Sequence, residues 1–139
     1  MLQPISCEHE LMFTLDRRLF TYGFALWLAA TVALRLAGQH LLRPGNWLAT
    51  LLLFALSFPA MALLARRLCK NFHLPSEKWL GAALSLSLPT LLLDPFSSAF
   101  FPVVFPNMAP EAAGTFGGWM LCCCAGALLG GAFRQSRQP

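Results

Sequence analysis

Charged residues are scarce in this sequence, and so are the β-branched residues that strands favour. Only 12% of the 139 residues are charged, which is about half the usual share of a soluble domain. Valine and isoleucine together number 4 against 29 leucines, and no stretch alternates as barrel strands do. These shortages argue against a soluble domain and against a membrane β-barrel.

Motifs that carry chemistry are also missing. The sequence contains no CxxC, no P-loop, no GxGxxG and no Ser-His-Asp set. The run Cys122–Cys124 looks chemical, but successive helical residues point about 100° apart and cannot converge on one metal. Cys7-Glu8-His9-Glu10 matches no metal-ligand spacing. We therefore expect no metal, no cofactor and no enzymatic activity.

The apolar residues come in blocks of about 20, the length that spans a bilayer as a helix. The sequence therefore predicts an all-α, polytopic membrane protein with four transmembrane helices in a compact bundle. Tails of 1–18 and 134–139 flank the membrane domain of 19–133. The helices are expected at 19–37, 47–65, 79–93 and 112–133.

Asp94-Pro95 follows the third block, and a largely aromatic segment, 96–105, comes after it. This segment either continues the third helix or lies as a short interfacial segment between helices 3 and 4. Pro95, Pro102 and Pro106 make one straight helix through and beyond this segment unfavourable.

The basic residues predict the orientation. The chain has a net charge of +4, but its basic residues are not gathered in one patch. Nucleic acid is therefore not an expected partner, whereas the lipid bilayer is an expected one. With both termini cytoplasmic, the positive-inside rule is obeyed by most of them. This topology suits a bacterial inner (plasma) membrane. The basic residues on the inner side are then Arg17, Arg18, Arg66, Arg67, Lys70, Lys78, Arg134 and Arg137.

Small residues recur at four-residue steps in two of the predicted helices. Such stripes let helix backbones approach closely. We expect the fourth helix to pack through its stripe, most simply against the first helix. The stripes are Ala25, Ala29, Ala33 and Ala37 in the first helix, and Gly114, Gly118, Cys122, Gly126 and Gly130 in the fourth.

Arg35 and Asp94 are costly inside a membrane. Counted from the inner ends of their helices, both lie roughly 21–24 Å deep, which predicts that they form an ion pair. Gln39 lies one turn beyond Arg35 on the same face. The pair either fixes helix register or contacts a substrate, ion or lipid headgroup.

Several strings in the sequence resemble one family. They are Arg35-Leu36-Ala37-Gly38-Gln39, Pro44-Gly45-Asn46-Trp47, Leu93-Asp94, and Phe101 with Val104-Phe105-Pro106-Asn107. Over 19–133 the chain resembles small bacterial four-helix membrane proteins known only as a domain of unknown function. The resemblance implies the fold and no activity. It also points to Arg35, Gln39, Asp94 and Asn107 as a candidate polar site.

Three functions remain open from the sequence. The first is a non-enzymatic subunit, assembly partner or regulator that acts through helix packing, with a membrane-protein partner or as a homo-oligomer. The second is a small oligomeric transporter or channel-like protein with the Arg35/Asp94 region in its path. The third, a lipid-modifying enzyme using Asp94 and His40, lacks a third catalytic group.

Overall fold

Four long helices make up most of the protein. A computed structural model describes residues 15–133, and these residues form helices and turns without a strand. Each long helix is long and apolar enough to cross a membrane, which confirms the predicted all-α membrane fold. The long helices are α1 (Arg17–Leu41), α2 (Trp47–Asn71), α3 (Trp79–Ala99) and α5 (Ala113–Ala132); the short elements are η2 (Ser76–Lys78), α4 (Phe101–Val104) and η3 (Pro110–Ala112).

Side-chain caps fix where the first two helices begin. The Asp16 carboxylate accepts a hydrogen bond from the Arg18 amide at 2.9 Å. The Asn46 side chain accepts one from the Ala49 amide at 3.2 Å, as asparagine commonly does at the start of a helix. Gly45 has φ +87°, a conformation that a side chain would strain, and this turn reverses the chain between α1 and α2.

The third helix is longer than the sequence predicts. It was expected to end at 93, but α3 runs through Asp94-Pro95 to Ala99. A proline removes one backbone hydrogen bond, which membrane helices tolerate. The helix breaks instead at Phe100, and Phe101–Val104 forms the separate helix α4. The aromatic segment therefore continues α3 in its first part and folds back as a short helix in its second.

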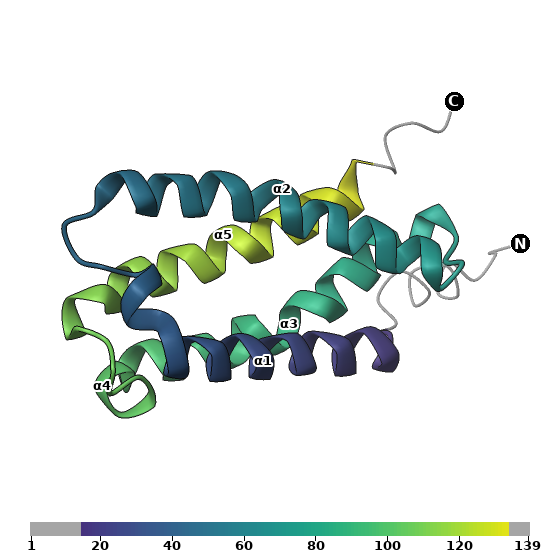
Figure 1. The fold of residues 1–139 in the computed structure, drawn as a ribbon. Helices are drawn as coiled ribbons and strands as arrows, with labels where there is room; N and C mark the ends of the chain where they lie inside the picture. Colours follow the sequence, from purple (N-terminus) through teal and green to yellow (C-terminus); the bar gives the residue numbers. More distant parts are fainter. Residues whose placement is uncertain (1–14, 134–139) are drawn as a thin grey trace, which may run out of the picture.

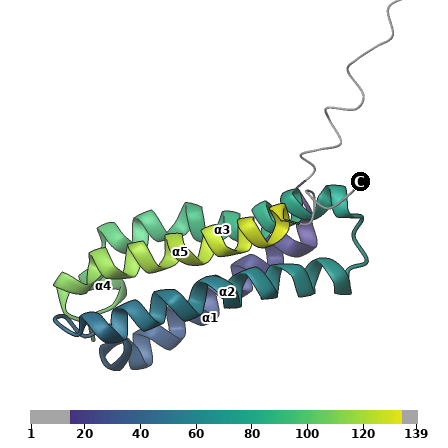
Figure 2. The same cartoon turned by 90° about the horizontal axis from the view of Figure 1, so that it is seen from above.

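The two central helices are α3 and α5. They pack on each other, α1 packs on α3, and α2 packs on α5, while α1 and α2 contact each other little (Figure 1). Figure 2 shows α3 and α5 together on one side, with α1 and α2 on the other. The start of α1 and the end of α5 lie at the same end of the bundle, and α4 lies at the opposite end.

The glycine stripe of α5 packs against α2. The sequence had suggested the first helix as its partner, and that prediction was wrong. A Cβ built on Gly130 would lie 2.5 Å from the Ala62 carbonyl oxygen, and one on Gly126 would collide with the Phe58 carbonyl. A Cβ on Gly118 would lie 3.5 Å from the Phe54 ring, whereas one on Gly114 would meet nothing within 4 Å. The partner helix presents backbone at the same four-residue steps, so the two helices approach closely.

Candidate functional site

The predicted Arg35–Asp94 ion pair is not formed. Asp94 accepts a hydrogen bond at Oδ1 from the Trp27 indole nitrogen at 2.9 Å, and its Oδ2 has no hydrogen-bond partner. Arg35 instead donates from Nη1 to the Val104 carbonyl at 3.3 Å. Each of the two charged residues therefore has a neutral partner.

The helix register explains why the prediction was wrong. The Asp16 amide donates to the Ser85 hydroxyl at 3.0 Å, so α1 begins beside the second turn of α3. From this contact Asp94 lies about nine residues along α3, roughly 14 Å, and Arg35 lies about nineteen along α1, roughly 28 Å. The ion-pair prediction holds only if both helices start at the same depth.

Three of the four predicted polar residues do come together, at the α4 end of the bundle. The Asn107 side-chain amide donates to Gln39 Oε1 at 2.6 Å and to the Leu34 carbonyl at 3.0 Å. With the Arg35–Val104 hydrogen bond, these contacts fasten the segment after α4 to the end of α1. Arg35 and Gln39 are exposed. Their arrangement is that of a clamp between helix and loop.

A cluster of aromatic rings packs next to this clamp. The rings of Phe101 and Phe105 in and after α4 pack on Phe116 of α5, with centroids 5.7 and 5.1 Å away. All three rings are almost fully buried. Burying such rings stabilises the fold-back of the chain after α3.

Asp94 lies apart from the clamp, beside a small cavity between α3 and α5. The residue is only 7% exposed. The cavity has a volume of about 130 Å³, and its polar lining comes from Asp94, Thr90 and Ser98. Its α5 side is lined by Gly117, Met120, Leu121 and Cys124. Among the described residues Asp94 is the one buried acidic side chain, and its unbonded Oδ2 is enclosed by protein and does not open into this cavity.

A second cavity lies between α1 and α2, over α3 and α5. Its volume is about 260 Å³, and the two tryptophans that line it are Trp27 and Trp119. The Trp119 indole nitrogen donates to the Ser57 hydroxyl at 2.7 Å, as Trp27 does to Asp94. Nothing in the sequence singles out these two tryptophans. They lie inside apolar blocks and not at predicted interfaces, and a buried indole N–H needs an acceptor.

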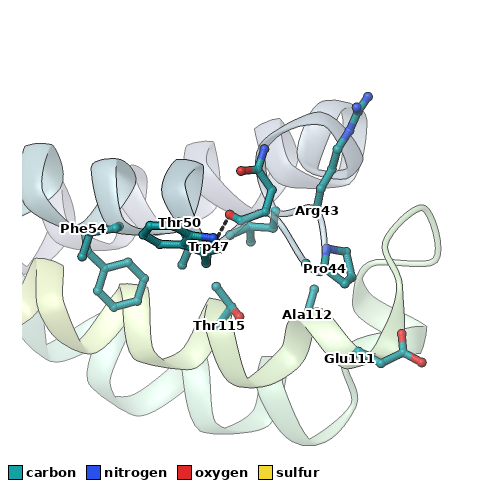
Figure 3. Close-up of a pocket in the computed structure, with 12 residues that line it drawn as sticks. Arg43, Pro44, Trp47, Thr50, Phe54, Glu111, Ala112 and Thr115 are labelled. Carbon is teal, nitrogen blue, oxygen red and sulfur yellow. Dashed lines mark hydrogen bonds between the residues drawn. The ribbon is translucent and has the colours of Figure 1, made fainter.

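A wider pocket of about 520 Å³ lies at the α4 end, between the α1–α2 turn, the start of α2 and the start of α5 (Figure 3). Arg43 and Glu111 lie at its rim and point away from it. Thr50 donates its hydroxyl proton to the Asn46 carbonyl at 3.1 Å. No charged side chain labelled in Figure 3 points into the pocket, so it offers little to recognise an ionic ligand.

The cysteine run diverges as the helix geometry predicts. Cys122 contacts the Phe54 carbonyl on α2 through its sulfur at 3.8 Å, while Cys124 is buried and lines the Asp94 cavity. Cys123 and Cys124 both line the cavity of about 260 Å³, whereas Cys122 faces α2.

Comparison with known proteins bears on the identity of the chain. No curated protein and no solved structure matches it. One family model matches residues 41–138, from the end of α1 through α5. Four membrane-spanning helices and this match agree with the resemblance seen in the sequence. The chain belongs to the family of unknown function DUF5367.

Proposed function

We propose that this protein is a non-enzymatic membrane subunit that acts by assembling with a second copy of itself through α1. The observation that carries the proposal is the alanine stripe of α1. All four alanines, Ala25, Ala29, Ala33 and Ala37, are exposed in the single chain. In contrast, three glycines of the α5 stripe are packed on α2.

The chain thus uses one small-residue stripe inside the fold and leaves a second one open. In a membrane, close backbone approach between small residues drives helix association, because lipid tails are as apolar as the side chains. A stripe that repeats the same residue at each step is self-complementary, which suits a two-fold contact between identical helices. A second copy is therefore the partner that fits this face.

The test measures oligomeric state in lipid nanodiscs or mild detergent, by light scattering or single-molecule photobleaching. We expect a dimer for the parent protein and a shift towards monomer for Ala29→Leu. Ala55→Leu is the matched control, because Ala55 is an exposed alanine of α2. A monomeric parent, an unchanged Ala29→Leu dimer, or a different protein bound at this face would contradict the proposal.

A small transporter is the second candidate, and the burial of Asp94 without a positive partner favours it. Ionisable residues inside a membrane domain commonly mark ion or proton pathways.

The orientation that we propose places both termini in the cytoplasm of a bacterial cell. It rests on the distribution of the basic residues.

A further inference from the structure

The cavity between α1 and α2 lies halfway along the bundle. Its volume is about 260 Å³, and all four long helices line it with residues from their middle turns, among them Trp27, Ala60, Leu86 and Cys123. In a membrane this level corresponds to the centre of the bilayer, far from the headgroups on either side. Whatever reaches the cavity from outside the bundle therefore comes from the hydrocarbon.

The walls of this cavity are almost wholly apolar. The indole N–H groups of Trp27 and Trp119 are already bonded to Asp94 and Ser57, so the two rings contribute apolar surface. The Ser87 hydroxyl is enclosed by protein. A buried water needs roughly two to four polar partners, and apolar cavities stay dry. The cavity therefore fits a hydrocarbon occupant and does not fit water or an ion.

The cavity opens sideways, between α1 and α2. These two helices contact each other little, and the lining residues Leu26 of α1 and Ala60 of α2 are exposed. In contrast, Leu86 of α3 and Cys124 of α5 are buried and form the floor. The opening therefore faces the lipid tails that surround the bundle.

The size of the cavity selects among apolar occupants. Engineered apolar cavities of about 150 Å³ already hold benzene, so a space of about 260 Å³ holds several carbon atoms more than one ring. A transmembrane helix is about 10–12 Å wide and does not fit into such a space. If the space stayed empty, its lining would lack van der Waals partners, and a flexible hydrocarbon chain supplies them.

We propose that this cavity binds the end of one phospholipid acyl chain, which enters from the bilayer between α1 and α2. The bound chain fills the centre of the bundle where α1 and α2 leave it uncovered. The residues of α1 that line the cavity are Gly23, Leu26, Trp27 and Ala30, and none of them belongs to the alanine stripe. The site is therefore independent of the proposed self-association.

The first test needs no variant. The full chain is placed in phosphatidylcholine nanodiscs that contain a phosphatidylcholine with a diazirine near the end of one acyl chain. On irradiation the diazirine loses N₂, and the carbene inserts into a neighbouring bond to hydrogen. By peptide mass spectrometry we expect adducts at Trp119 or Cys123, at least half as frequent as those at Leu121, which is 63% exposed on the same helix.

A lipid with the diazirine beside its headgroup is the control for this labelling, and it should leave Trp119 and Cys123 unmodified. Chain-end adducts confined to Leu121 and other exposed residues would overturn the proposal, because they would show that no chain enters between α1 and α2.

The second test uses the tryptophans that line the cavity. Bromine atoms quench indole fluorescence on contact, and lipids can carry them near the end of an acyl chain. Trp27 and Trp119 line the cavity, whereas Trp47 and Trp79 begin their helices and lie far from the chain ends. We expect chain-end bromines to quench the protein more strongly than bromines placed near the headgroup.

Ala60→Phe is the variant that fills the mouth of the cavity, and it should lose at least half of the quenching by chain-end bromines. Ala55→Phe is the matched control, because Ala55 is an exposed alanine of the same helix that does not line the cavity, and it should keep the quenching of the parent. Equal quenching in the parent and in folded Ala60→Phe would overturn the acyl-chain site.

Discussion

Replacing Gly130 with alanine tests how closely α2 and α5 must approach. The new Cβ would lie 2.5 Å from the Ala62 carbonyl oxygen and 2.8 Å from its Cα. Carbon contacts are optimal at roughly 3.5 Å, so α2 must retreat by roughly 1 Å. Overpacking costs about 1–3 kcal/mol, and the better helix propensity of alanine offsets about 1 kcal/mol. We expect a net loss of up to about 2 kcal/mol in the free energy of unfolding.

Two matched variants make this measurement decisive. Gly114 has nothing within 4 Å, so Gly114→Ala should be neutral or stabilise by up to about 1 kcal/mol. Gly118 meets only the Phe54 ring, at 3.5 Å, and Gly118→Ala should be tolerated. Thermal unfolding in mild detergent, followed by circular dichroism, gives the order of stability. If Gly130→Ala unfolds at the same temperature as Gly114→Ala, backbone contact between α2 and α5 is not what limits the fold.

Three further predictions concern the polar contacts and the orientation. In double-mutant cycles, the losses in free energy of unfolding caused by Arg35→Ala and Asp94→Ala should add to within about 0.5 kcal/mol. Those caused by Trp27→Phe and Asp94→Asn should show a coupling energy above that value. The reverse pattern would show that Arg35 and Asp94 do form an ion pair. Asn107→Leu should cost about 1–2 kcal/mol and speed amide hydrogen exchange in 101–108, and unchanged exchange would contradict the clamp. Reporter fusions after residues 43, 73 and 108 should read outside, inside and outside, and the opposite readings would invert the topology.

The number and approximate position of the helices could be predicted because each depends on one segment alone. A block of about 20 apolar residues is long enough to cross a bilayer whatever surrounds it. The Asn46 cap is equally local, since it joins a side chain to an amide three residues away. The end of α3 was not predictable in this way. Asp94-Pro95 has the chemistry of a helix stop in water, but in this bundle the helix continues through it.

Helix pairing could not be predicted, because it depends on distances between segments. The stripe in α5 shows that some helix packs there, but the atoms it meets are the backbone carbonyls of Phe58 and Ala62. Every residue has such a carbonyl, so no side-chain pattern identifies the partner. The same dependence on distances between helices explains why the Arg35–Asp94 prediction was wrong. Depth along one helix can be counted, but the offset between helices is fixed by contacts such as that of Gly23 with Leu86.

The central position of α5 has a consequence for how the protein is made. Chains are synthesised from the N-terminus, so α2 enters the bilayer before its packing partner exists. It is the most apolar of the four spans and the least buried in the bundle, which suits a helix that must be stable among lipids on its own. The less apolar α3 carries Asp94, and α1 is already present to receive it. This order of synthesis predicts that the α1–α3 pair assembles first and that α5 completes the bundle by packing between α3 and α2.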